Sequence, residues 1–221
     1  MTNIMYRIIA SGLLLSFMSL QAFAQSRHKA GEFDYYTMAL SWSPTYCDTR
    51  RNNKPEQQCD GQRPYAFVLH GLWPQYNRGW PSFCRARNRW VPNDIIKSML
   101  DIMPSKRLII HQWRKHGVCS GVDTKTFFEL SRQAFNSIKI PERYTSPQNT
   151  ILISPSDVEN DFLKANPKLK ADMISIQCGR GRRLREVRIC FNRDLKLTPC
   201  GANENQRRLC RRDKIVMPPV R

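Results

Sequence analysis

The chain has 221 residues and a formal net charge of +18, because 36 Lys and Arg residues stand against 18 Asp and Glu residues. This length suits one domain with a sizeable core, and the sequence contains no internal repeat or low-complexity linker. The charge predicts a polyanionic partner, either nucleic acid or an anionic cell surface, although a surface charged only for solubility would give the same count.

The first 24 residues have the pattern of a secretory signal peptide. Arg7 precedes an apolar run from about Ile8 to Leu20, and small residues near Ala24 indicate cleavage after that position. A membrane anchor is the alternative, but the run is short for a bilayer, and no other stretch approaches that length. The expected mature protein is residues 25–221, one domain without a membrane span, secreted or periplasmic.

Two strands are predicted in the first half of the chain. Residues 33–42 are rich in aromatic and β-branched side chains, and residues 65–73 form an apolar run that should be a buried strand ending near His70. The polar stretch 44–64 is expected to be a loop closed by cysteines. Residues 74–90, rich in Trp, Asn, Gly and Pro, are expected to be a second loop.

Helices are predicted next, followed by further strands. One helix should follow Pro92, a second should contain His111, a third should cover residues 124–138, and a fourth should begin behind a Ser154 N-cap. After these helices the apolar residues alternate as they do in strands. The alternating segments are residues 172–178, 184–191 and 214–217. Central helices with strands towards both ends indicate an α+β domain.

Eight cysteines lie in the expected mature chain, and an even number in an exported protein predicts four disulfides. They are Cys47, Cys59, Cys84, Cys119, Cys178, Cys190, Cys200 and Cys210. No two of them form a CxxC pair, so a zinc site is a weak alternative. The sequence alone leaves the connectivity open.

The segment HQWRKHG gathers polar side chains at helical spacing. In a helix, His111 lies one turn before Lys115, and Gln112 lies one turn before His116, so that four polar groups converge on one patch. The spacing of the two histidines and the lack of a nearby carboxylate do not fit a zinc site. The alternative is a solvated basic helix face with Trp113 packed inward.

A third histidine, His70, lies at the expected end of the buried strand. The glycine after it permits close approach of the backbone, and Trp73 offers a ring for stacking. A core histidine bonded to the backbone is the alternative. Three of the four histidines nevertheless fall in two short segments, which favours a joint chemical role.

Two histidines, a lysine and a cationic surface suit cleavage of RNA by its own 2′-hydroxyl group. One imidazole, with a pKa of about 6.5, removes the 2′-OH proton, and the other protonates the leaving 5′-oxygen. A fixed cation such as Lys115 stabilises the charge on the phosphorus oxygens. The substrate supplies the nucleophile, so no metal or cofactor is required, and DNA, which lacks this hydroxyl, is spared.

The segments FVLHGLWPQ and HQWRKHGVC resemble the two active-site motifs of the ribonuclease T2 family of secreted acid ribonucleases. LSWSPTYC and LREVRICFNRDLKLTPC are similar to further family segments, so that the resemblance extends from about Phe33 to Cys210. It implies an α+β fold with a central, mainly antiparallel sheet and helices packed on it. It also implies a monomeric, metal-independent endoribonuclease that cuts single-stranded RNA through 2′,3′-cyclic phosphates to 3′-phosphate ends. The absence of an Asn-x-Ser/Thr site fits a bacterial source.

The resemblance further implies which cysteines are joined and which residues act. The implied bridges are Cys47–Cys59, Cys84–Cys119, Cys178–Cys210 and Cys190–Cys200. The implied roles are an acid–base pair of His70 and His116, a phosphate-binding His111, a Lys115 that stabilises the pentacoordinate phosphorus, and base-pocket residues Trp73 and Gln75, with Tyr76 and Trp80 as further candidates.

One residue departs from the family pattern, which usually reads H-E-W where this chain reads H-Q-W. Gln112 can donate and accept hydrogen bonds, but it cannot carry a negative charge or relay a proton. We expect an active enzyme, because both histidines and Lys115 remain. The alternatives are a non-catalytic RNA-binding relative and a basic secreted toxin or surface-binding protein.

Overall fold

The computed structural model describes residues 28–49, 57–60 and 63–221. The expected signal peptide, residues 1–24, lies outside this part of the chain. No helix among the described residues is long and apolar enough to cross a membrane.

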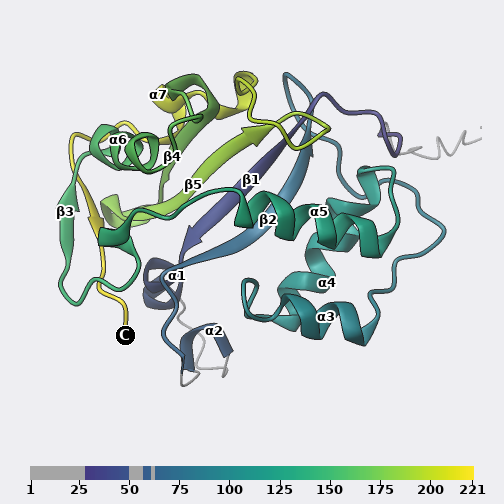
Figure 1. Ribbon diagram of the computed structural model, residues 1–221, viewed down its shortest axis with the longest axis horizontal. Helices are drawn as coiled ribbons and strands as arrows, with labels where there is room; N and C mark the ends of the chain where they lie inside the picture. Colours follow the sequence, from purple (N-terminus) through teal and green to yellow (C-terminus); the bar gives the residue numbers. More distant parts are fainter. Residues whose placement is uncertain (1–27, 50–56, 61–62) are drawn as a thin grey trace, which may run out of the picture.

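The centre of the molecule is a four-stranded sheet in which every pair of neighbours is antiparallel (Figure 1). Its order is β2-β1-β5-β4, and a separate two-stranded sheet joins β3 to β6. The strands are β1 (Tyr35–Trp42), β2 (Phe67–Gln75), β3 (Ile151–Ile153), β4 (Ile174–Cys178), β5 (Leu184–Phe191) and β6 (Ile215–Met217). The predicted α+β class with a central antiparallel sheet is therefore confirmed.

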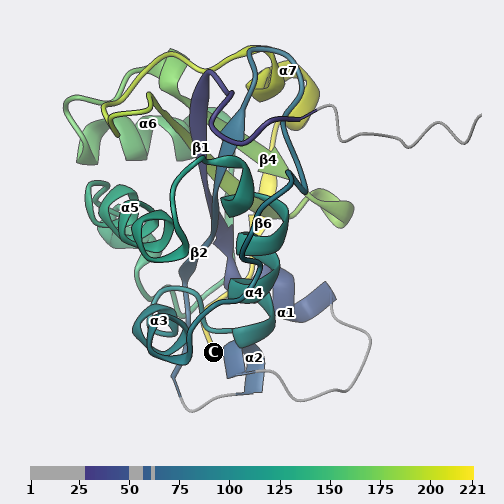
Figure 2. The same ribbon diagram turned by 90° about the vertical axis from the view of Figure 1, so that its right-hand side faces the viewer.

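The helices gather at the two edges of the central sheet. α4 and α5 pack against β2, and α6 and α7 pack against β4 (Figures 1 and 2). The helices are α1 (Ser43–Thr49), α2 (Gln57–Asp60), α3 (Asn93–Met99), α4 (Lys106–Lys115), α5 (Thr124–Asn136), α6 (Pro155–Ala165) and α7 (Gln206–Leu209). Between these two groups of helices, one face of the sheet carries polar side chains from β2 and β5.

The core lies on the other face of the sheet, where alternate residues of each strand are apolar. Met38 and Leu40 of β1 are fully buried, as are Val187 and Ile189 of β5. Phe127 of α5 belongs to the same buried cluster. Strand alternation therefore separates an apolar face from a polar one, as the period of two in the sequence predicts.

Four disulfides join the cysteines in the pairs that the family resemblance implies: Cys47–Cys59, Cys84–Cys119, Cys178–Cys210 and Cys190–Cys200. Cys84–Cys119 connects the segment after β2 to the short 3-10 helix that follows α4. It therefore ties together the two chain segments that carry the predicted motifs.

Several predicted boundaries are wrong. The expected loop 44–64 contains α1 and α2, because Pro44 at the start of a helix has its backbone φ already fixed at a helical value. β2 does not end near His70 but continues to Gln75, because a bulge allows the strand to pass that residue. β3 and α7 were not predicted, since they have only three and four residues and carry almost no periodic signal.

Candidate active site

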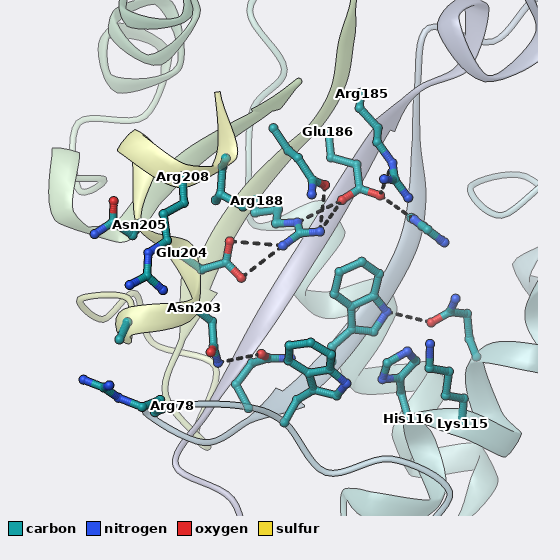
Figure 3. A pocket seen from close by; sticks show the side chains of 18 of the residues that line it. Arg78, Lys115, His116, Arg185, Glu186, Arg188, Asn203, Glu204, Asn205 and Arg208 are labelled. Carbon is teal, nitrogen blue, oxygen red and sulfur yellow. Dashed lines mark hydrogen bonds and ion pairs between the residues drawn. The ribbon is translucent and has the colours of Figure 1, made fainter. Parts of the chain in front are cut away.

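A cavity of about 670 Å³ lies on the polar face of the sheet. Its walls come from β2, from α4 and His116, from β5, and from residues 202–209. Figure 3 shows Lys115 and His116 across the cavity from Glu204 and Arg208. All three histidines of the predicted motifs line this one cavity, so two segments distant in sequence form one site.

A β-bulge turns His70 into the cavity. Ala39 of β1 pairs with Gly71 and Leu40 pairs with Leu69, so His70 is an extra residue without a partner in the register. Successive strand residues point to opposite faces, so His70 and Trp73, three apart, would face opposite sides of a regular strand. The bulge reverses this, and the two rings lie side by side with centroids 5.1 Å apart.

Small side chains on β1 let groups from β2 and β5 meet across it. Ala39 lies between Gly71 of β2 and Arg188 of β5 in the register. The guanidinium carbon of Arg188 consequently reaches to 5.1 Å from the ring centroid of Trp73.

The helix α4 presents the second motif as its spacing predicts. Ser105 caps the helix by accepting a hydrogen bond from the Leu108 N–H, and Ile109 and Trp113 pack into the core. The opposite side of the helix faces the cavity. The lining from this segment is His111, Gln112, Lys115 and His116, the four residues predicted to converge.

Gln112 is buried, with 1% of its surface exposed, and accepts a hydrogen bond from the Trp73 indole at 2.7 Å. The indole nitrogen can only donate, so the oxygen of the carboxamide must face Trp73 and its NH₂ group must point elsewhere. A side chain at Gly71 would collide with both groups. The glycine after His70 therefore permits the close approach expected of it.

His116 is a buried imidazole at the C-terminal end of α4. Its ring stacks on Trp73, with centroids 5.3 Å apart and an interplanar angle of 27°. Burial, together with the positive charge of Lys115, lowers the pKa of His116 to about 3. The pKa of His111 is also lowered, first by partial burial and then by Lys115 and His70. His116 is therefore a neutral imidazole over most of the pH range.

His70 has a different environment because it is bonded to a carboxylate. Its Nδ1–H donates to Glu186 at 2.7 Å, and the Glu186 side chain is 1% exposed. Burial alone would raise the pKa of Glu186, but the bond to His70 and the charges of Arg188 and Arg185 lower it to about 2. The carboxylate thus stays ionised and fixes the tautomer of His70, with Nε2 as the remaining ring nitrogen.

Glu186 belongs to a buried network of charges (Figure 3). Arg188 donates to Glu186 at 2.8 Å, to Gln177 at 2.7 Å and to Glu204 at 3.3 Å. Glu204 also accepts from Ser175 at 3.0 Å. The network holds Glu186 in place, which in turn holds His70.

This network was not predicted from the sequence. Glu186 and Arg188 alternate with Val187 and Ile189 in an apolar strand, and two charged residues on one face of a buried strand are unusual enough to mark a site. A second bulge adds to them: Gln177 pairs with Glu186 and Cys178 with Leu184, so Arg185 is an extra residue that also lines the cavity.

The predicted base-pocket residues separate into two groups. Trp73, Gln75 and Trp80 line the cavity, and Gln75 accepts a hydrogen bond from Asn203 at 3.1 Å. Tyr76 does not line it. Its hydroxyl lies 3.2 Å from Nδ1 of His28, because the residue after β2 turns away from the sheet. The role of Tyr76 in base binding therefore stays a prediction that the lining of this cavity does not support.

Among the described residues, no group of three or more His, Cys, Asp or Glu side chains is arranged to hold a metal ion. The polar groups that line the cavity are instead imidazole, ammonium, guanidinium and amide groups, together with two carboxylates that are paired with Arg188. This set is suited to proton transfer and to binding an anion.

Comparison with known proteins gives one consistent family. The model of the ribonuclease T2 family matches residues 33–200. A ribonuclease of Aeromonas hydrophila is 35% identical over 205 residues, covering 91% of both chains. Ribonuclease I of Escherichia coli is 25% identical over 236 residues, covering 86% of this chain and 87% of the relative.

Solved structures show the same fold. An RNase-related protein from Calystegia sepium superposes with a TM-score of 0.68 at 23% identity, covering 85% of this chain and 98% of the other. RNase NT in complex with 5′-AMP superposes with a TM-score of 0.60 at 22% identity, covering 85% and 99%.

Proposed function

Because the chain belongs to the ribonuclease T2 family and is a ribonuclease, we propose that it cuts single-stranded RNA internally by attack of the 2′-hydroxyl, without a metal ion. The observation that carries the proposal is the contrast between its two histidines. His116 is buried and neutral, whereas His70 is bonded to the ionised carboxylate of Glu186. Opposed environments of this kind separate an acid from a base.

His116 is the general base in this proposal and His70 is the general acid. A base must be deprotonated at the working pH, and the pKa of about 3 keeps His116 neutral. An acid must be held in place beside the leaving oxygen, and the bond from Nδ1–H to Glu186 orients the His70 ring with Nε2 as the nitrogen that faces that oxygen. Glu186 is thus a positioning residue that acts through His70.

The bond changes follow from these roles. His116 takes the 2′-OH proton, the 2′-oxygen forms a bond to phosphorus, and the bond from phosphorus to the 5′-oxygen breaks as His70 protonates that oxygen. The product is a 2′,3′-cyclic phosphate and a 5′-hydroxyl. Water then opens the cyclic phosphate to a 3′-phosphate, with the two histidines exchanging roles.

The scissile phosphate is held by Lys115, His111 and Gln112. The Lys115 ammonium stabilises the charge that develops on the phosphorus oxygens, and the NH₂ group of Gln112 provides a neutral donor because its oxygen is bonded to Trp73. Gln112 therefore tunes a working site in this proposal. It is also the residue that favours the alternative of a non-catalytic RNA-binding relative.

The base on the 5′ side of the cut is proposed to lie near Gln75 and Trp80. The Trp73 indole already contacts His70, His116 and Arg188, so it serves better as a wall that spaces the histidines. Trp80 is 52% exposed and borders the cavity, which leaves its ring available for stacking on a base. The four disulfides support a secreted or periplasmic location.

The test is digestion of single-stranded RNA by the purified protein in excess EDTA, with product ends identified by mass spectrometry. The expected products carry 2′,3′-cyclic phosphate and 3′-phosphate ends, and DNA or 2′-O-methyl RNA stays intact. Restoration of lost activity by zinc or magnesium would overturn the metal-free mechanism. An inert protein that binds RNA would establish the non-catalytic alternative.

A further inference from the structure

A second cationic surface lies outside the cavity, in the segment that joins β2 to α3. We call the exposed residues Phe83, Arg85, Arg87, Arg89 and Trp90 the basic–aromatic strip. The sequence between residues 61 and 93 contains no Asp or Glu. Within the described part of the chain, no ion pair joins these three arginines to a carboxylate, so their charges are unneutralised.

The aromatic rings of the strip are unusually open to solvent. Phe83 is 50% exposed and Trp90 is 60% exposed, although rings of this size normally gain free energy from burial. Phe83 also has a φ of 52°, a left-handed conformation that costs free energy for a residue other than glycine. An exposed ring on a strained backbone is a recurring feature of binding sites.

The strip is held firmly against the C-terminal end of α4. The Cys84–Cys119 disulfide anchors it, the Phe83 N–H donates to the Lys115 carbonyl at 2.8 Å, and Arg114 of α4 donates to the Arg89 carbonyl at 3.4 Å. Figure 2 shows the segment between β2 and α3 running along α4. A strand bound at Lys115 therefore has the strip immediately beside it.

We propose that the basic–aromatic strip binds the RNA strand beyond the scissile phosphate. This inference rests on the proposed function, since it places further nucleotides of the same substrate. Arginines interleaved with exposed rings are the composition of surfaces that bind single strands, where phosphates contact the cations and bases stack on the rings. Stacking on a ring needs no particular base, so the strip adds affinity for long RNA without sequence preference.

The first test compares a dinucleotide with a long single-stranded RNA as substrates. The variant Arg85→Ala/Arg87→Ala/Arg89→Ala should cleave the dinucleotide at the unmutated rate. Its kcat/KM on long RNA should fall by about tenfold or more, and the slope of log kcat/KM against log salt should become about 2 less negative, since each lost charge contributes about 0.7. The matched control Lys164→Ala/Lys168→Ala/Lys170→Ala removes three exposed cations near α6 and should change the long-RNA rate far less.

A second variant separates stacking from charge. Phe83→Ala/Trp90→Ala should also lower kcat/KM on long RNA by about tenfold, but with an unchanged salt slope, because no cation is lost. Equal losses in the strip and control variants would overturn the proposal, as would an unchanged rate on long RNA. A fall in kcat/KM on the dinucleotide as large as the fall on long RNA would also overturn it, because such a fall would indicate damage to the active site.

Direct binding keeps this result apart from the proposed function. Fluorescence anisotropy with a 2′-O-methyl oligouridylate measures strand binding without cleavage, so the strip can be tested even if the unmutated protein cuts nothing. The strip variants should bind the oligonucleotide more weakly than the control. If they instead bind the oligonucleotide normally and lose binding to phosphatidylglycerol vesicles, the strip is a membrane-binding surface and the RNA proposal fails.

Discussion

The two walls of the cavity differ in how they are built. The α4 wall is formed by the last turns of one helix. In it, His111 lies next to Lys115 and Gln112 lies next to His116, because the residues of each pair are four apart. The β5 wall joins Glu186 to His70, which is 116 residues away in sequence. One wall is local and carries His111, Lys115 and His116, whereas the other is assembled by the sheet and carries the Glu186 carboxylate with Arg188. The histidine held by each wall consequently has a different electrostatic environment.

The largest effects should come from removing the two histidines. His116→Ala and His70→Ala should each lower kcat by about 10²–10⁴-fold, the usual contribution of one acid or base. A substrate with a good leaving group in place of the 5′-nucleoside needs no acid, so it should rescue His70→Ala and leave His116→Ala slow. Measured kcat on both substrates checks this. Rescue of His116→Ala alone would reverse the two roles.

The next prediction isolates the β5 wall. Glu186→Gln keeps the shape of the side chain but removes the negative charge that lies next to Nδ1 of His70. We expect kcat to fall roughly 10- to 100-fold, the worth of a charge-assisted hydrogen bond, with KM nearly unchanged. Measured kcat and KM on one dinucleotide check this, because a loss confined to kcat shows that Glu186 acts through His70 and not on substrate binding.

Glu204→Gln is the matched control for this variant. Glu204 is also buried and also bonded to Arg188, but it has no bond to His70. Glu204→Gln disturbs the same network. A fall in kcat that both variants share is therefore due to Arg188, and any further fall in Glu186→Gln is due to the lost contact with His70. Equal kcat values and equal pH profiles would mean that Glu186 has only a structural role.

The sequence predicted the α4 wall almost completely, for a physical reason. A helix repeats over a few residues, so Trp113 as the core residue determines which side chains face the cavity. The family resemblance added the disulfide pairs and the roles, which spacing alone left open. Helix periodicity thus predicts which side chains of one helix lie together, without knowledge of the rest of the fold.

The β5 wall could not be predicted in the same way. The strand itself was predicted, but the face to which Glu186 points depends on its register with β1, and His70 reaches that face only through the bulge. Bulges arise from tertiary pairing and leave no periodic signal. Tyr76 directly follows Gln75, which lines the cavity, yet Tyr76 does not line it and its hydroxyl lies beside Nδ1 of His28.

The two walls should also respond to acid in different pH ranges. His116 has a pKa of about 3 in the fold and 6.5 as its ordinary value, so the unfolded chain binds its proton first. Stability due to a neutral His116 is complete above pH 6.5 and is lost as the pH falls towards 3, by at most about 1.4 kcal/mol per pH unit. The stability due to an ionised Glu186 is lost as the pH falls from 4.5 to about 2, because the pKa of Glu186 is lowered by that amount in the fold.

Urea unfolding at a series of pH values checks this prediction. His116→Ala should flatten the free energy of unfolding between pH 6.5 and 4.5 and make its decline between pH 4.5 and 3 shallower. Glu186→Gln should leave the slope above pH 4.5 unchanged and make only the decline below it shallower. The same slope in all three proteins between pH 6.5 and 4.5 would show that His116 is not a buried neutral group.

The smallest effect is expected at Gln112, where the chain departs from its family. Gln112→Glu can still accept the Trp73 N–H, so the indole should keep its position. The new carboxylate adds a negative charge beside His116 and Lys115 and favours the charged imidazole, so both limbs of the pH–rate profile should move to higher pH. The maximum rate should change by less than about tenfold, because the loss of a donor to the phosphate is offset by a stronger imidazole base.

Gln112→Ala separates the two functions of this side chain. It leaves the Trp73 N–H without its buried partner, which costs about 1–3 kcal/mol of stability, and it removes a donor to the phosphorus oxygens. The pH–rate profiles of the three proteins on one dinucleotide, together with their urea midpoints, distinguish these effects. If Gln112→Ala has the same pH–rate profile and the same urea midpoint as the unmutated enzyme, Gln112 contributes to neither the α4 wall nor the reaction. If only Gln112→Glu cleaves RNA, this chain binds RNA without cutting it, because the α4 wall then requires the carboxylate that its relatives carry.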